Sequence, residues 1–149
     1  NSYNLPFQLL IFLIFIQIIL GAFVSGLDAG KIYQTWPMMG NNYLPNDLNF
    51  HRLQNIFEFN NHSLVQFYHR NLAYLIFFYV IILTILIYRN RLFNLYRPIK
   101  IVFLFLFLQA ALGIFTLISN LNIFLASAHQ ITSVFLIFSA LNLYFLRAK

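Results

Sequence analysis

Four long runs of apolar side chains set the strongest limit on what this chain can fold into. They cover residues 5–24, 64–88, 99–118 and 123–146, and a helix needs roughly 20 such residues to cross the hydrocarbon core of a bilayer. Only 8% of the 149 residues are charged, whereas charged residues make up about 25% of an average soluble domain. We therefore expect an all-α, polytopic membrane protein, in which residues 1–149 form a single transmembrane bundle of four helices.

The basic residues predict how these spans are oriented. The long segment 25–63 contains only Lys31 and Arg52, and Arg70 lies just inside the following run. The opposite side is richer in positive charge: the link between the second and third runs holds Arg89, Arg91 and Arg97, and the chain ends with Arg147 and Lys149. By the positive-inside rule, both termini and that link are cytoplasmic, and segment 25–63 faces outward. This topology fits a bacterial inner membrane or, alternatively, a mitochondrial inner membrane.

Composition excludes several other classes of protein. The formal net charge is +6, but the basic residues are scattered and do not form the clustered face that nucleic acid binding needs. The chain has no cysteine, so disulfides, iron–sulfur ligation by this chain and thiol catalysis are excluded. Because it begins with Asn1 rather than methionine, we expect a processed chain or a part of a longer polypeptide.

Segment 25–63 continues a stretch that reads GAFVSGLDAGKIYQTWPMMG. A connection this long is usually functional or disordered. Trp36 and the proline after it favour an ordered loop near the membrane interface, and a solvated linker is the alternative. Asp28 is placed to bond free backbone N–H groups at the helix end or to meet Arg70. An ordered loop here would form the edge of a lid over the bundle.

The first and third runs contain a repeated pattern. IQIILGAF matches LQAALGIF, so that Gln17 corresponds to Gln109 and Gly21 to Gly113, at an offset of 92. Gln and Gly at this spacing share one helix face, where glycine permits close approach and glutamine can bond a neighbouring helix. We expect two similar helical hairpins related by an axis along the membrane normal. Chance similarity between two apolar runs is the alternative.

The second and fourth runs each carry one histidine near the outward end, His69 and His129. Ionisable groups inside a membrane are costly and usually mark a functional site. Three interpretations are open. In the first, each imidazole only bonds a neighbouring helix. In the second, both serve a proton relay, although neither run offers a carboxylate. In the third, both are axial ligands of a haem between these two helices.

Small residues lie close to both histidines. They are Ala73 on the second run and Ala126, Ser133 and Ala140 on the fourth. A stripe of this kind leaves room for a flat macrocycle, although small residues in membranes more often serve close helix packing. Arg70 could pair with a haem propionate or extend to the lipid headgroups.

Taken together, these segments resemble heme A synthase. The specific blocks are GLDAGKIYQTWPMMG and VQFYHRNLAY, and LQAALGIF and SAHQ add weaker support. The similarity runs from about Gln17 to the end of the last run. Members of that family have eight spans in two similar four-helix halves, and this chain resembles the C-terminal half of the cysteine-free type.

The resemblance implies an oxidoreductase, because heme A synthases oxidise the C8 methyl of heme O to the formyl group of heme A for cytochrome oxidase assembly. It implies that His69 and His129 are the axial ligands of the iron of a haem b, with Arg70 beside them. It also places Glu58 on an acidic loop position, as a weak catalytic candidate or a solvated acid. The substrate haem would lie in the other half, so this chain alone would not complete the reaction.

Several partners are expected from the same resemblance: heme O, the lipid bilayer, heme O synthase, an electron donor and a second copy of the chain. Two other functions stay open, a stand-alone bis-histidine membrane cytochrome that passes electrons to a partner, and a haem-free membrane scaffold or transporter half. His51 and His62 are expected to be exposed, Asp47 to lie in a turn, and Gln17 and Gln109 to join helices.

Overall fold

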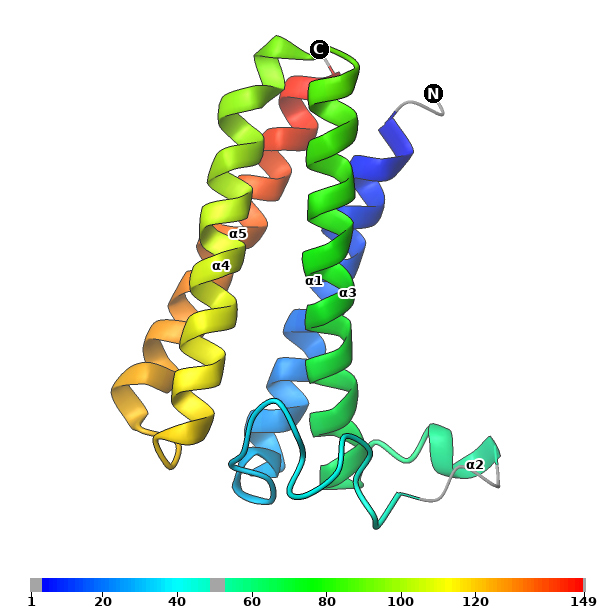
Figure 1. Ribbon diagram of the computed structural model, residues 1–149, viewed down its shortest axis with the longest axis vertical. Helices are drawn as coiled ribbons and strands as arrows, with labels where there is room; N and C mark the ends of the chain where they lie inside the picture. Colours follow the sequence, from blue (N-terminus) through cyan, green and yellow to red (C-terminus); the bar gives the residue numbers. More distant parts are fainter. Residues whose placement is uncertain (1–3, 49–52, 149) are drawn as a thin grey trace.

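Four long helices make up the body of the protein in its computed structural model, which describes residues 4–48 and 53–148 (Figure 1). They are α1 (Leu5–Gly26), α3 (His62–Arg89), α4 (Tyr96–Ile118) and α5 (Ile123–Ala148). Short helical turns lie in the connections: η2 (Ala29–Lys31), α2 (Leu53–Ile56) and η3 (Phe93–Leu95). Each long helix is long and apolar enough to cross a membrane, which confirms the expected all-α membrane bundle. The helices outrun the apolar runs because polar residues such as His62 and Arg89 continue them at their ends.

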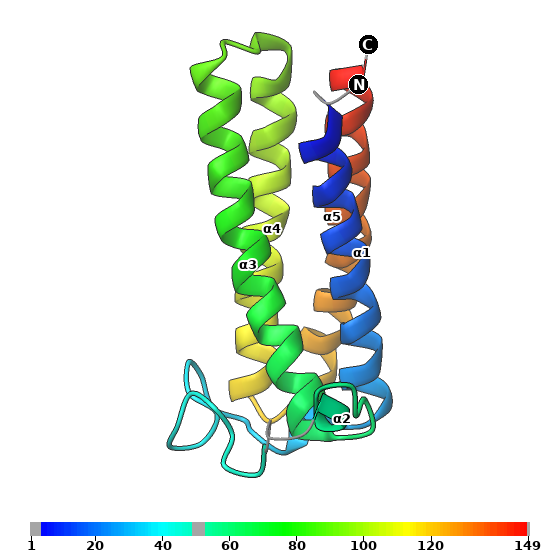
Figure 2. The same cartoon turned by 90° about the vertical axis from the view of Figure 1, so that its right-hand side faces the viewer.

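The helices form two antiparallel hairpins, α1 with α3 and α4 with α5, which stand side by side as one bundle (Figures 1 and 2). α1 also packs against α5, and α3 against α4. α3 and α5 therefore lie diagonally across the bundle from each other. Both termini and the α3–α4 link lie at one end, here called the terminal end. The α1–α3 connection and the α4–α5 turn lie at the other, here called the loop end.

Local sequence explains where the helices begin. Pro6 stands in the first turn of α1, where a missing backbone N–H costs no hydrogen bond. Asn61 caps α3, because its side-chain oxygen accepts a hydrogen bond from the Leu64 N–H at 3.1 Å. Asn122 acts in the same way at the start of α5, where its side-chain oxygen accepts from the Phe124 N–H at 3.0 Å.

The main cluster of buried hydrophobic residues occupies the half of the bundle near the termini. Its buried residues are mostly bulky and aliphatic, and they are Phe7, Leu10 and Ile14 on α1, Ile76, Val80, Leu83 and Ile87 on α3, Leu95 in η3, Ile99, Val102 and Leu106 on α4, and Leu136, Ala140 and Leu143 on α5. The core positions recur every three or four residues along each helix, which is the spacing of one helix face.

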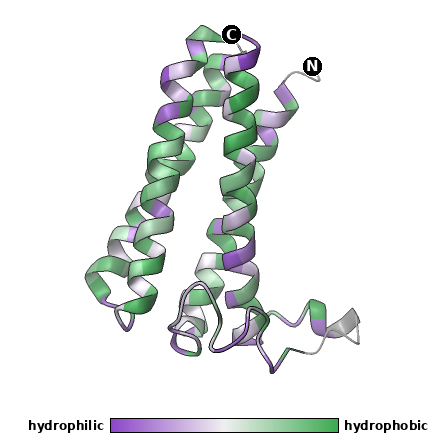
Figure 3. Ribbon diagram, in the orientation of Figure 1, coloured by the Kyte–Doolittle hydropathy of each residue, from purple (hydrophilic) through white to green (hydrophobic). Residues whose placement is uncertain are grey.

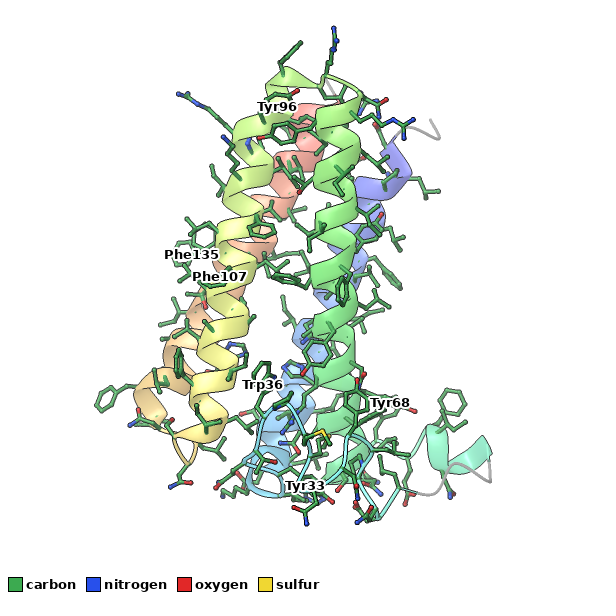
Figure 4. All side chains as sticks on the ribbon, viewed as in Figure 1. Tyr33, Trp36, Tyr68, Tyr96, Phe107 and Phe135 are labelled. Carbon is green, nitrogen blue, oxygen red and sulfur yellow. The ribbon has the colours of Figure 1, made fainter. Side chains whose placement is uncertain are left out.

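Most residues along the four long helices are hydrophobic, with hydrophilic ones mainly near their ends (Figure 3). Phe107 and Phe135, which point away from the bundle in Figure 4, are 58% and 51% exposed, and many other large apolar side chains share this exposure. Water would disfavour such a surface. Together with the helix lengths, it identifies a multi-pass membrane protein whose outer faces are solvated by lipid.

The connection between α1 and α3 folds back over the loop end. Within it, the Tyr33 hydroxyl donates to the Asp47 carboxylate at 2.8 Å, and Asp47 lies in a hydrogen-bonded turn, as expected. Gly30 is buried against the α4–α5 turn, where a Cβ on this glycine would lie 3.0 Å from Leu121 Cδ2. The connection therefore touches the second hairpin as well as the first.

The expected role of Asp28 is wrong. Its carboxylate pairs with Lys31 Nζ at 2.8 Å, both side chains are exposed, and it makes no side-chain hydrogen bond to the following turn. The left-handed backbone of Asp28, with φ 55°, starts the 3₁₀ turn that brings Lys31 within reach. An exposed pair of this kind contributes little to stability.

We expect the Tyr33–Asp47 contact to hold across neutral pH and to fail at both extremes. Hydrogen bonding to Asp47 raises the pKa of Tyr33 above its ordinary 10.0. Burial alone would raise the pKa of Asp47, but hydrogen bonds from Ser63 and Tyr33 outweigh it and hold that pKa below 3.8. The stabilisation is thus complete between these ordinary values, and it is lost as pH falls through the lowered Asp47 pKa or rises through the raised Tyr33 pKa.

Hydrogen exchange of the loop amides, corrected for intrinsic rates, measures this window. Protection should fall at both ends of the pH range in the native protein. In an Asp47→Asn variant the acid-side loss should disappear, since an amide does not titrate there. An unchanged acid transition in that variant would show that another group controls the loop.

Candidate functional site

The interior of the bundle changes character between its two halves. In the terminal half the inward positions hold the aliphatic core. In the loop half the same helix faces carry small or polar residues, which are Gln17 and Gly21 on α1, His69 and Ala73 on α3, Gln109 and Gly113 on α4, and His129 and Ser133 on α5. All of these except Gln109 are only partly buried. The main aliphatic cluster therefore ends where the histidines begin, and nearer the loop end only isolated aliphatic side chains of the long helices, such as Leu20, Leu64 and Val65, are buried.

In the first hairpin, His69 of α3 lies against α1. The Gln17 amide nitrogen donates to the His69 main-chain carbonyl at 3.0 Å and lies 3.4 Å from the ring Nε2. A Cβ on Gly21 would lie only 3.2 Å from His69 Cε1, so the glycine gives the ring its place. The Nδ1 atom of the same ring is buried and has no hydrogen-bond partner.

The second hairpin repeats this arrangement with His129 of α5 against α4. The Gln109 amide nitrogen donates to the His129 main-chain carbonyl at 2.7 Å. A Cβ on Gly113 would lie 3.0 Å from His129 Cε1. The repeated Gln and Gly of the sequence thus make the same two contacts in both hairpins, which confirms the two similar hairpins and the role of the glutamines in joining helices.

Hydrogen bonding fixes which nitrogen of His129 carries its proton. The ring Nδ1 lies 3.1 Å from the Gln109 main-chain oxygen, and a carbonyl oxygen can only accept, so Nδ1 is protonated and Nε2 keeps its lone pair. Neutral imidazoles held in this way by a carbonyl are typical of histidines that bind a metal through the other nitrogen. In the first hairpin the corresponding atom, His69 Nδ1, is also buried but has no hydrogen-bond partner, which is uncommon for a buried polar atom.

The donor set suits a flat cofactor better than a bare metal ion. Within the described residues, no three His, Asp or Glu side chains come together as a metal cage would require. The structure instead offers two imidazoles, from helices that lie diagonally across the bundle. Two imidazoles on opposite sides form the ligand set of a bis-histidine haem, with the macrocycle between them.

The small residues near the histidines divide between two roles. Ala140 belongs to the packed core of the terminal half, so close helix packing explains it. Ala73, Ala126 and Ser133 are partly buried in the loop half, each about one turn from a histidine. Their small size limits how far the chain itself fills the interior beside the rings.

Arg70 holds the α1–α3 connection. Trp36 lies in the middle of the stretch that it holds, and the Trp36 indole N–H donates to the Tyr74 hydroxyl at 3.0 Å, one turn further along α3. Figure 4 shows Trp36 at the loop end of the bundle. The Arg70 guanidinium donates to the main-chain carbonyls of Tyr33 at 2.9 Å, Thr35 at 2.9 Å and Met38 at 3.3 Å. The stretch is therefore fastened to α3 directly beside His69.

The other predicted residues lie away from this arrangement. Glu58 has an exposed side chain in the connection, and His62 is exposed at the start of α3 as expected. His51 and Arg52 lie outside the described residues. Sequence reasoning missed Tyr74 and Thr132; the available signal was their spacing, since Tyr74 follows Arg70 by one turn and Thr132 follows His129 by just under one turn.

The chain is similar over most of its length to known proteins. A family described as cytochrome oxidase assembly protein matches residues 2–141. Three curated relatives are named heme A synthase. The Pelagibacter ubique protein is 41% identical, and the match covers 91% of this chain and 40% of that protein. The Wolbachia pipientis protein is 45% identical, with coverage of 93% of this chain and 37% of that protein, and the Rickettsia felis protein is 35% identical, with coverage of 89% and 39% respectively. The chain spans about two fifths of the length of these relatives. No solved structure matches it.

Replacing Gly113 by alanine should displace His129. The new Cβ would lie 3.0 Å from the ring, and the ring is tied to Gln109 on the same helix as the new methyl group. We expect a loss of about 1–3 kcal/mol in stability, as for overpacked sites generally, measured by thermal unfolding in detergent. Gly26→Ala is the matched control, since nothing lies within 4 Å of a Cβ there, and alanine favours the helix. Equal stability of the two variants would contradict this account.

Replacing Arg70 by methionine should release the loop. The variant loses the hydrogen bonds to three main-chain carbonyls, and we expect proteolysis at the loop end to accelerate by roughly tenfold, since hydrogen bonds from charged donors are the stronger ones. Arg70→Lys should give an intermediate rate, because an ammonium lacks the planar fork of a guanidinium. Arg89→Met, at the exposed terminal end, is the control and should leave the rate unchanged.

Proposed function

This chain belongs to the family of cytochrome oxidase assembly proteins, and from that premise we propose that it is the haem b-binding half of a heme A synthase. Such an enzyme oxidises the C8 methyl of heme O to the formyl group of heme A. The chain corresponds to about two fifths of the curated heme A synthases that it resembles. On this proposal it is the electron-transfer half of an oxidoreductase, and the rest of the enzyme holds the substrate haem.

One observation carries the proposal: two imidazoles stand at the same end of the bundle, on diagonal helices, each beside a glycine that makes room for it. His129 has an Nε2 lone pair that its fixed Nδ1–H leaves available, and His69 holds the matching position in the first hairpin, against Gln17 and Gly21. The aliphatic core stops short of both rings. These features fit haem b with His69 and His129 as axial ligands.

Bound there, haem b would supply a one-electron Fe(III)/Fe(II) couple. The residues of the chain would set its surroundings. Gln109 orients His129 and fixes its tautomer, and the loop held by Arg70 would shield the loop end from water. Arg70 would also place a positive charge near the haem carboxylates. Glu58 remains only a weak catalytic candidate on this proposal, because its side chain is exposed in the connection.

We further propose that the loop end faces outward and that both termini are cytoplasmic. The terminal end carries most of the basic residues, including Arg89, Arg97, Lys100 and Arg147, as the positive-inside rule requires of the cytoplasmic side. The relatives are bacterial, which favours a bacterial inner membrane over a mitochondrial one. The partners would be heme O, heme O synthase, an electron donor and, in a homo-oligomer, a second copy of the chain.

The reduced-minus-oxidised absorption spectrum of the full-length polypeptide, purified in detergent, tests the proposal. We expect a low-spin haem signal that is lost in both His69→Ala and His129→Ala, since each variant removes one axial ligand. His62→Ala is the control, because His62 is exposed outside the bundle, and it should keep the signal.

Three results would contradict the proposal or narrow it. A folded protein without haem would point to a membrane scaffold. A signal that survives in both histidine variants would place the haem elsewhere. A normal spectrum with no conversion of heme O by the full-length polypeptide would favour a membrane cytochrome that only passes electrons to a partner.

A further inference from the structure

The two hairpins differ at one hydrogen bond within their shared frame. In both, the glutamine amide nitrogen gives one N–H to the main-chain carbonyl of the histidine. That nitrogen carries a second N–H. In the second hairpin Gln109 donates it to the Thr132 hydroxyl at 2.9 Å. In the first hairpin Gln17 instead faces the ring Nε2 of His69 at 3.4 Å.

These contacts give the two imidazoles the same tautomer but different hydrogen-bond partners. The atom of Gln17 that meets the His69 carbonyl must be the amide nitrogen, since a carbonyl only accepts. The same nitrogen lies against His69 Nε2, so Nε2 is the acceptor there and the ring proton sits on Nδ1, where it has no partner. For His129 the Nδ1–H is satisfied by Gln109 and Nε2 is not engaged by the glutamine.

A single sequence difference accounts for the divergence. Thr132 lies three residues after His129, and its hydroxyl donates to the Ala128 carbonyl at 2.9 Å while it accepts from Gln109. The residue three positions after His69 is Leu72, which has no acceptor. With no hydroxyl to receive it, the second N–H of Gln17 turns to the imidazole.

We propose that Gln17 restrains His69, and that this makes His69 the displaceable one of the two axial ligands while His129 is the permanent one. The inference rests on the proposed haem site. To bind a metal through Nε2, His69 must first break its contact with Gln17. Its Nδ1–H also lacks the hydrogen bond to a carbonyl oxygen that makes an imidazole a stronger ligand. His129 has that hydrogen bond, and its Nε2 is not held by the glutamine. Gln17 is thus a positioning residue, and Leu72 determines that it acts on the ring.

Haem content of the full-length polypeptide tests the order of the ligands. His69→Gly should retain the haem of this site on His129 and should recover the low-spin spectrum when imidazole is added. His129→Gly should lose the haem. Equal loss in the two variants, or better retention in His129→Gly, overturns the proposal. The signal belonging to this site is the part that a His69→Ala/His129→Ala double variant lacks; if the double variant lacks nothing, the proposed haem site itself fails.

A milder substitution tests the cause. Leu72→Thr should give Gln17 a hydroxyl acceptor and free His69, and Leu72→Val, which matches threonine in shape without the hydroxyl, is its control. Carbon monoxide, which binds the reduced haem only when an axial ligand leaves, is the probe. We expect binding to the signal of this site to be roughly fivefold slower in Leu72→Thr than in the native protein, the change that one ordinary hydrogen bond produces.

Leu72→Val should bind the probe at the native rate. Equal rates in the threonine and valine variants overturn the role of Leu72 and Gln17. If the haem of the native protein binds no carbon monoxide at all, the proposal that His69 is a displaceable ligand is overturned.

Discussion

An imidazole laid against a glycine backbone and tied to a glutamine is the contact on which both hairpins depend. In each, the glutamine amide crosses to the main-chain carbonyl of the histidine, and the glycine one turn later leaves just enough room for the ring. Within a bilayer these polar groups cannot turn to water instead. The contact therefore fixes the register of each helix pair, and the positions of the core, the loop and the two histidines follow from that register.

The same frame, used twice, carries two different connections. The α4–α5 pair is closed by a tight turn, in which Asn120 and Leu121 have positive φ. The α1–α3 pair is closed by a long segment that Arg70 and Tyr74 hold down. The helical parts of the repeat differ at the second hydrogen bond of the glutamine, and the connections differ in length, so the two histidines have unlike surroundings. In the proposed haem site, this inequality would let the surroundings of the two histidines be tuned separately.

Sequence reasoning reached the fold further than it reached the site. The four spans and the paired hairpins were predictable, because lipid demands long apolar helices and because Gln and Gly recur at a fixed offset on one helix face. The use of Arg70 on loop carbonyls was not predictable, since main-chain acceptors leave no mark in the sequence. Asp28 was misassigned because its partner Lys31 comes within reach only through a left-handed backbone turn. The hydrogen bond from Gln109 to the Thr132 hydroxyl depends on how the glutamine side chain is oriented, and residue spacing does not encode that orientation.

The burial of Gly30 against Leu121 has a consequence for biogenesis. Leu121 follows α4 in the chain, so the segment just after α1 cannot settle until two further helices have been synthesised and inserted. Chains are made from the N-terminus onward, and the earliest part of the outer connection is therefore among the last to find its final neighbours. The stretch held by Arg70 and Tyr74 needs only α3, so the two parts of one connection reach their final packing at different stages of synthesis.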